Sequence, residues 1–289
     1  MVRAPPGRFS IANPLVLQRE SPYNQVMIQE ILRPRTVPEA VRLKKSPRSA
    51  YLGGGTWLNT RASDELEILI SLENLGLGAI DTAHGLCIIG AAASLQEIVD
   101  APSAPQAVRA AASLTSSRSV RNMQTIGGEL GSNMEDSALI PVLFALSAEV
   151  NLAGKRKPVP IERFCRERPA DLILSVSVAF LPCEARAVSR TSHSPRSLVA
   201  AVSFKDCRPV VRDVRVVVSD CRGQRLRLHE VERALEGNTL PAKNLIEKWV
   251  GAAFAPAADI HASGACKAYL AGILVADALH ALAAGKNAP

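Results

Sequence analysis

The pattern of apolar and polar positions divides the chain into two differently built parts. Up to about residue 183, short apolar runs typical of buried strands are mixed with segments of helical periodicity. After that point, apolar runs at 198–204 and 210–219 predict paired strands. Helices are then predicted at 229–236, 241–254 and 264–284. Mixed elements followed by a strand-then-helix module predict an α+β fold.

Capping and turn patterns define the elements of the first part. Thr36 and Ser94 each stand three residues before a glutamate, a capping-box spacing that predicts the start of a helix. Further strands are predicted at 50–52, 68–72, 148–152 and 172–181, a hairpin over 79–90 turning near His84, and helices at 106–114 and 140–146. Pro182 follows the last of these strands, so we expect a domain boundary there.

The first 26 residues differ from the rest of the chain. They contain four prolines and three arginines and show no sustained periodicity. We expect residues 1–26 to be a disordered leader, or Met27 to be the true translation start. The remaining chain is predicted to form a domain of residues 27–183 and a smaller domain of residues 184–289.

Charge narrows the choice of partners. The net charge is +7, and basic residues gather at 155–168 and 205–227, where acidic residues are mixed with them. A single aromatic residue, Phe164, is interleaved with these charges, which argues against nucleic-acid binding. We interpret them as solvated surface, with contact to an acidic partner subunit as the alternative.

Cysteine spacing and hydropathy limit the possible sites further. The six cysteines form no C-x-x-C pair and the five histidines are scattered, so we expect no metal or iron–sulfur cluster held by this chain alone. No signal-peptide pattern is present, which favours a cytoplasmic protein. The apolar segment 268–284 contains Asp277 and His280 and predicts a packed helix, not a membrane span.

Two glycine-containing segments are the candidate binding loops. They are Leu52-Gly53-Gly54-Gly55-Thr56 and Gln124-Thr125-Ile126-Gly127-Gly128. Glycine lets main-chain N–H groups converge on a phosphate, although either segment alone could equally be a tight turn. The first segment fits neither the Walker nor the dinucleotide G-x-G-x-x-G pattern. Taken together, they predict that N–H groups from both loops meet around one diphosphate.

The order of motifs is more specific than either loop. Tyr51-Leu-Gly-Gly-Gly-Thr56, the Ile89-Gly90-Ala91 segment, Arg121-Asn-x-x-Thr-Ile-Gly-Gly128 and Leu143-Phe-Ala-Leu146 follow one another. This order resembles the FAD-binding (medium) subunits of molybdenum hydroxylases of the xanthine dehydrogenase and carbon monoxide dehydrogenase type. Thr-Ile-Gly-Gly-Glu and Leu235-Glu-Gly-Asn238 resemble a bacterial branch described as xanthine dehydrogenase or selenate reductase FAD subunits.

The resemblance covers about residues 27–285 and implies both a fold and a cofactor. The fold is a two-lobed FAD-binding domain (PCMH-like) followed by a smaller α+β domain of the carbon monoxide dehydrogenase flavoprotein type. The cofactor is FAD, with no metal site and no catalytic side chain in this chain. The implied FAD contacts are Ala50, Tyr51, Leu52, Gly53, Gly54, Gly55, Thr56, Trp57, Gln124, Thr125, Ile126, Gly127, Gly128, Ile173 beside the isoalloxazine, and Arg186 approaching the flavin.

Two positions depart from the pattern of the resembling family. Glu129 stands where an asparagine is usual, and Ala138 stands where an aspartate contacts the cofactor. Asp136 is nearby, but a shift of two residues on a helix points a side chain elsewhere. The departures imply that flavin affinity or redox tuning differs from that of better-known members.

The function implied by the resemblance is electron transfer within a complex. Electrons would come from a molybdopterin-binding large subunit through a 2Fe–2S small subunit, reach FAD here, and leave to NAD or another acceptor. Neither a membrane nor nucleic acid is expected as a partner. Two alternatives stay open, a stand-alone flavin oxidoreductase and a scaffold subunit that has lost its flavin. The substrate would be decided on another subunit.

Overall fold

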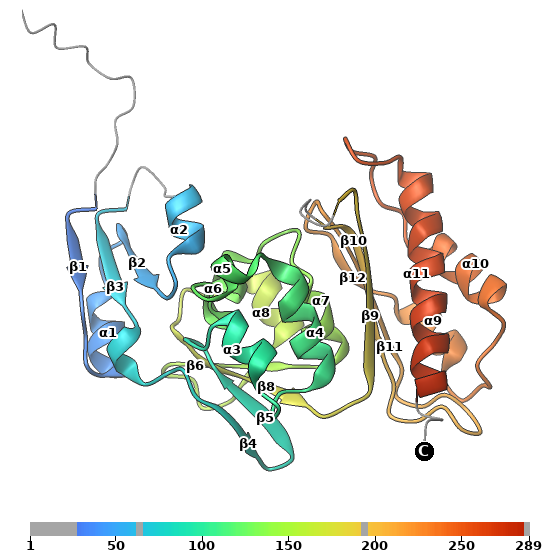
Figure 1. The fold of residues 1–289 in the computed structure, drawn as a ribbon, viewed down its shortest axis with the longest axis horizontal. Helices are drawn as coiled ribbons and strands as arrows, with labels where there is room; N and C mark the ends of the chain where they lie inside the picture. The colour runs from blue at the N-terminus through green and yellow to red at the C-terminus, as the bar shows by residue number, and fades with distance from the viewer. Residues whose placement is uncertain (1–27, 62–65, 192–195, 286–289) are drawn as a thin grey trace, which may run out of the picture.

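Three β-sheets organise the protein in the computed structural model, which describes residues 28–61, 66–191 and 196–285 (Figure 1). The first sheet has the strand order β1-β3-β2, the second β4-β5-β8-β6-β7, and the third β12-β11-β10-β9. The expected leader, residues 1–26, lies outside the described residues. The sheets follow one another along the chain and give a first lobe, a central lobe and a C-terminal part.

The first lobe is a small parallel sheet covered by one helix. Its strands are β1 (Glu30–Leu32), β2 (Ser49–Leu52) and β3 (Ile68–Ser71), and its helices are α1 (Val37–Leu43), α2 (Thr56–Arg61) and the 3-10 turn η1 (Glu73–Leu75). The Thr36 hydroxyl accepts a hydrogen bond from Glu39 N and starts α1. The Glu39 carboxylate, however, accepts from Arg35 N and not from Thr36 N, so only half of the predicted capping box forms.

The central lobe contains the predicted hairpin and a layer of helices (Figure 1). Its strands are β4 (Ile80–Ala83), β5 (Leu86–Gly90), β6 (Glu149–Leu152), β7 (Val159–Pro160) and β8 (Ile173–Ala179). Its helices are α3 (Leu95–Asp100), α4 (Gln106–Thr115), α5 (Arg118–Arg121), α6 (Ile126–Ser132), α7 (Leu139–Ala145) and α8 (Ile161–Glu167). His84 and Gly85 take positive φ at the hairpin turn, and Ser94 and Glu97 form the full capping box of α3, which confirms both predictions.

The third sheet lies between two hydrophobic cores and has apolar side chains on both faces. Its strands are β9 (Cys183–Ser189), β10 (Arg196–Ser203), β11 (Arg215–Asp220) and β12 (Arg225–Arg227). Ala200 and Val202 of β10 face the core formed with helices α9 (His229–Leu235), α10 (Lys243–Ala253) and α11 (Gly264–Gly285), whereas Ala201 faces the core of the central lobe. Figure 1 shows α7 on one side of the sheet and α11 on the other.

In the later part of the chain, one strand prediction was wrong in extent and one strand was not predicted. Residues 208–214 form a loop, and β11 begins only at Arg215. The apolar Val211 is fully buried there because its main chain exchanges hydrogen bonds with Gly237 and Asn238, which follow α9. Strand β9 was not predicted, because the sequence Cys-Glu-Ala-Arg-Ala-Val-Ser is only half-buried and lacks a strong apolar pattern.

Helix α11 is held against the third sheet by packing and by a buried ion pair. By length and composition alone it could cross a membrane, but in this structure it packs against α10, β9 and β10. Its Lys267 is 2% exposed, and its ammonium group lies 3.5 Å from the Asp220 carboxylate at the end of β11. A Cβ at Gly272 would lie 2.9 Å from the Glu247 carbonyl oxygen, so a residue without a side chain permits this close helix packing.

Candidate functional site

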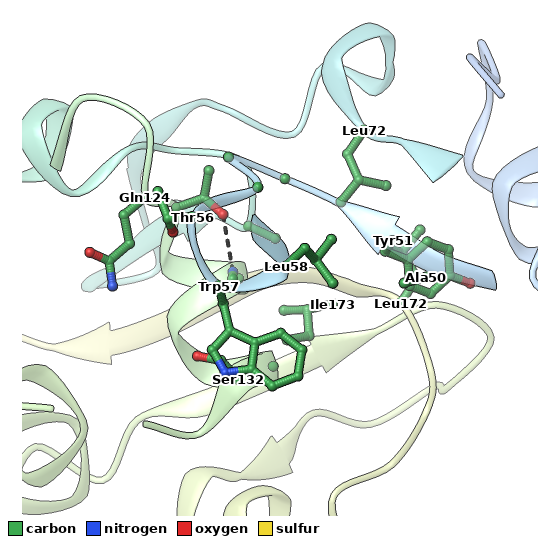
Figure 2. Close-up of a pocket in the computed structure, with 18 of the residues that line it drawn as sticks. Ala50, Tyr51, Thr56, Trp57, Leu58, Leu72, Gln124, Ser132, Leu172 and Ile173 are labelled. Carbon is green, nitrogen blue, oxygen red and sulfur yellow. Dashed lines mark hydrogen bonds between the residues drawn. The ribbon is translucent and has the colours of Figure 1, made fainter. Parts of the chain in front are cut away.

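A cavity of about 590 Å³ opens where the first lobe meets the central lobe (Figure 2). The first lobe contributes the end of β2 and the start of α2. The central lobe contributes the segment 124–128, helix α6 and the segment 169–173 that leads into β8. Both predicted glycine loops therefore reach the same cavity.

The two loops also touch each other at a point where no side chain fits. A Cβ added to Gly54 would lie 1.4 Å from the Met123 carbonyl oxygen. A Cβ on Gly53 would lie 2.7 Å from the Thr125 hydroxyl oxygen. The first loop can approach the second this closely only because both residues lack a side chain.

The glycines of the second loop bring helix α6 against the end of β5. A Cβ on Gly127 would lie 2.6 Å from the Ala91 carbonyl oxygen. Thr125 caps the helix, since its hydroxyl oxygen accepts a hydrogen bond from Gly128 N at 3.0 Å. These contacts fix the second loop against the central lobe, independently of any ligand.

The main-chain donors of the second loop are mostly used inside the protein. Gln124 N donates to Val120 O, and Ile126 N donates to Ala93 O. Gly127 N donates to Ala91 O, and Gly128 N donates to the Thr125 hydroxyl oxygen. These four N–H groups therefore already have internal acceptors, and the contact of the second loop with a diphosphate stays a prediction. An isolated β-bridge between Thr125 and Ser94 contributes one of these bonds, from Ile126 N to Ala93 O, and anchors the loop to the segment before α3. Thr125 N has no acceptor among the described residues.

The first loop keeps its donors available. Within the described part of the chain, the main-chain N–H groups of Gly54 and Gly55 have no internal acceptor. Gly55 has a φ of 71°, and consecutive N–H groups around a left-handed residue form a concave site that suits an anion. The first loop is therefore the better candidate for a phosphate ligand.

Most of the predicted contact residues meet in the cavity. Those that line it are Ala50, Tyr51, Gly53, Gly54, Gly55, Thr56, Trp57, Gln124, Thr125, Gly127, Gly128 and Ile173. Leu52 is not part of the lining, and Ile126 is fully buried in the core of the central lobe. Arg186 does not line the cavity either, because β9 carries it in the third sheet, where its guanidinium pairs with Glu184.

Several lining residues were not predicted from the sequence. Those with a charged, hydroxyl, thioether or aromatic side chain are Lys44, Ser116, Ser132, Met134, Phe164 and Asp171. Lys44 and Asp171 are the charged residues of the described lining, and they come from different lobes. Burial, and then the nearby Asp171 carboxylate, raise the pKa of the Tyr51 hydroxyl, which therefore stays protonated. Nothing in the local sequence distinguishes Lys44 from the neighbouring Lys45, since only the packing of α1 turns it toward the cavity.

The two positions at which the sequence differs from the family pattern, Glu129 and Ala138, do not line the cavity. Ala138 is the buried residue before α7, and neither it nor Asp136 lines the cavity. Glu129 is 1% exposed and lies behind the second loop, where its carboxylate accepts a hydrogen bond from the Gln124 side chain. Within residues 28–61, 66–191 and 196–285, no group of three His, Cys, Asp or Glu side chains is placed to hold a metal ion.

The lining combines two kinds of surface. Gly54 and Gly55 offer N–H donors and Lys44 a positive charge to the same cavity. Trp57, Leu172 and Ile173 offer apolar area (Figure 2). A ligand with a phosphate group and a large aromatic ring would satisfy both surfaces.

Comparison with known proteins identifies such a ligand. Residues 25–179 match the family model described as "FAD binding domain in molybdopterin dehydrogenase". The chain is 36% identical over 258 residues to the uncharacterized protein YgfM of Escherichia coli (strain K12). The aligned region covers 87% of this chain and 95% of YgfM.

Solved structures show the same fold. A carbon monoxide dehydrogenase from Hydrogenophaga pseudoflava matches with a TM-score of 0.78 at 23% identity, over 89% of this chain and 97% of that chain. Quinoline 2-oxidoreductase from Pseudomonas putida 86 matches with a TM-score of 0.79 at 17% identity, over 90% and 98% of the two chains. These matches confirm the predicted fold class, an FAD-binding domain with a further C-terminal domain.

The contact between the loops makes a prediction about stability. We expect Gly54→Ala to lower the free energy of unfolding by about 1–3 kcal/mol, because the new methyl group forces the Met123 main chain away. Gly131→Ala is the matched control, since Gly131 also lines the cavity but a Cβ there meets nothing within 4 Å. It should raise the same quantity by up to about 1 kcal/mol, as expected for alanine in a helix. Equal effects in urea unfolding would contradict the described contact.

Proposed function

Because this chain belongs to the family of FAD-binding domains of molybdopterin dehydrogenases, with FAD as its cofactor, we propose that FAD lies in the cavity between the two glycine loops. We further propose that the protein is the flavoprotein subunit of a molybdenum hydroxylase complex. The observation that carries the proposal is the meeting of both loops at one cavity, where the Gly54 and Gly55 N–H groups have no acceptor among the residues that the structure describes.

The residues present fit the cofactor chemically. The diphosphate of FAD needs hydrogen-bond donors and positive charge, which the first loop and Lys44 supply. Its ring systems need apolar walls, which Trp57, Leu172 and Ile173 supply. A Cβ at Gly54 would close the junction between the loops, so the cradle depends on glycine.

The protein contributes position and shielding, not acid–base catalysis. When bound, FAD supplies the ability to exchange electrons singly or in pairs. Gly54 and Gly55 bind and orient the diphosphate, and Lys44 offsets part of its negative charge. Ile173 and Leu172 exclude water from one wall of the cavity. Arg186 stays a predicted flavin contact only if the cofactor extends beyond the cavity toward the third sheet.

The proposed electron path passes through partner subunits. Electrons would leave a molybdopterin-binding large subunit, cross a 2Fe–2S small subunit, reach FAD here and leave to NAD or another acceptor. The family description supports the molybdopterin partner, and the similar folds belong to a carbon monoxide dehydrogenase and a quinoline 2-oxidoreductase. A cytoplasmic location and the 27–183 and 184–289 domains stay predictions.

One observation favours a second candidate function, a scaffold subunit without flavin. Ala138 replaces the aspartate of the resembling family, and no carboxylate of the 135–138 segment lines the cavity in its place. Asp171 does line the cavity, but it belongs to the segment before β8 and not to this one. The two functions differ in whether the purified chain holds FAD.

Flavin retention tests the proposed function directly. We expect the full chain to bind FAD with one equivalent retained after desalting, measured by its visible absorbance. Gly127→Val should lose the flavin, because its side chain collides with the Ala91 carbonyl and displaces the second loop. Gly251→Ala, on α10 with open space around it, should keep the flavin. A colourless wild-type chain that also refuses added FAD would establish the scaffold, and a fully yellow Gly127→Val would refute the loop assignment.

A second prediction isolates the role of charge. Lys44 lines the cavity and the adjacent Lys45 does not, although both follow α1. We expect Lys44→Gln to weaken FAD binding by about fivefold, equal to about 1 kcal/mol for a half-exposed charge, with the loss shrinking at high salt. Lys45→Gln should leave the Kd unchanged. Equal Kd values for both variants, from quenching of flavin fluorescence, would remove Lys44 from the site.

A further inference from the structure

Glu129 is a buried carboxyl group directly behind the second loop. It follows Gly128, which lines the cavity, and it is only 1% exposed. One carboxyl oxygen accepts a hydrogen bond from the Gln124 side-chain amide. The other is buried and has no hydrogen-bond partner of normal geometry among the described residues, although the Ser137 side chain is close enough to lower the pKa of the group. A buried carboxylate with an unpaired oxygen is costly, whereas a neutral carboxylic acid is much less so.

A short hydrogen-bond chain connects Glu129 to the cavity. The Ser116 hydroxyl donates to the Gln124 side-chain oxygen at 2.8 Å, and the Gln124 amide nitrogen donates to Glu129. Both Ser116 and Gln124 line the cavity. Glu129 therefore fixes which end of the Gln124 side chain faces which neighbour at the cavity wall.

The charged and titratable groups around Glu129 come from several elements. The charged groups that act on it are Asp136, from the segment after α6, and Arg225, from β12. Arg225 in turn interacts with Glu135 and with Cys165 and Arg168 at α8. Of the strands in contact with α6, β5 carries Cys87 as its titratable residue and β8 carries none. Arg225 does not pair with Glu129, because its guanidinium donates to Asn133 and to the Met134 carbonyl oxygen. Burial raises the pKa of Glu129, and Asp136 raises it further, while Ser137, Gln124 and Arg225 act in the opposite direction.

We propose that Glu129 is a positioning residue of the flavin site, and that FAD binds preferentially to the form of the protein in which this side chain is protonated. The inference rests on the proposed function, since it needs the diphosphate near the glycine loops. A neutral Glu129 adds no negative charge behind that diphosphate, whereas an ionised one repels it through a poorly screened protein interior. Ionisation would also draw the Gln124 amide inward, away from the cavity wall.

The pH dependence follows from this linkage. Bound FAD raises the pKa of Glu129 above its value in the free protein, so binding takes up a proton in the range between the two. FAD affinity is highest below the pKa of the free protein and falls as the pH rises through it. Each unit by which the two pKa values differ changes the Kd tenfold.

Titration of the full chain with FAD at a series of pH values tests the proposal. Burial raises the pKa of Glu129 above that of an exposed carboxyl group, so the titration extends from acidic to alkaline pH. We expect the Kd from flavin fluorescence to rise at least about threefold across it, a change of about half a logarithmic unit. Glu129→Gln keeps a carbonyl oxygen for Gln124 but cannot ionise, so its Kd should stay flat. Glu135→Gln removes an exposed carboxylate of the next segment and should keep the wild-type slope.

Two outcomes would overturn the proposal, a wild-type Kd that does not change with pH and a Glu129→Gln slope equal to that of the wild type. Calorimetry of FAD binding in buffers of different ionisation enthalpy gives an independent reading that needs no variant. Proton uptake by the wild type supports the proposal, and its absence at every pH refutes it even if Glu129→Gln fails to fold. A wild-type chain that binds no FAD at any pH instead refutes the proposed function.

Discussion

The contact between the Gly54 main chain and the Met123 carbonyl is the constraint on which the site depends. It joins a loop of the first lobe to a loop of the central lobe at a spacing that excludes any side chain. Lys44, at the end of α1 in the first lobe, lines the cavity that forms at this junction. The cavity exists only while the two lobes meet here, so binding and the junction of the lobes depend on the same residues.

The two glycine loops differ in how their main-chain N–H groups are used, despite their similar composition. In the second loop the glycines allow close packing on Ala91, and most of the N–H groups are used to hold the loop in place. In the first loop the N–H groups of Gly54 and Gly55 have no acceptor in the part of the chain that the structure describes. The second loop is therefore a rigid support, and the first loop is the element that offers donors. A site preorganised in this way loses little freedom when a ligand binds.

Local patterns predicted the elements whose stability is local, and failed where distant packing decides. The Ser94 capping box and the turn at His84 follow from a few adjacent residues, and the structure has both. The loop containing Val211 was mistaken for a strand, because burial by a loop gives the same apolar pattern. The motif order identified the cavity-lining loops. It could not reveal Lys44, or that the second loop uses its own donors, since both depend on contacts between segments far apart in the sequence.

The most direct test of the account is an experimental structure of the full chain with FAD bound. The account predicts that the diphosphate oxygens lie within hydrogen-bond distance of the Gly54 and Gly55 main-chain nitrogens, with the 124–128 segment on the other side and its internal hydrogen bonds intact. A diphosphate bound elsewhere, or a second loop that has given up its bonds to Ala91 and Ala93 to reach the phosphate, would contradict it.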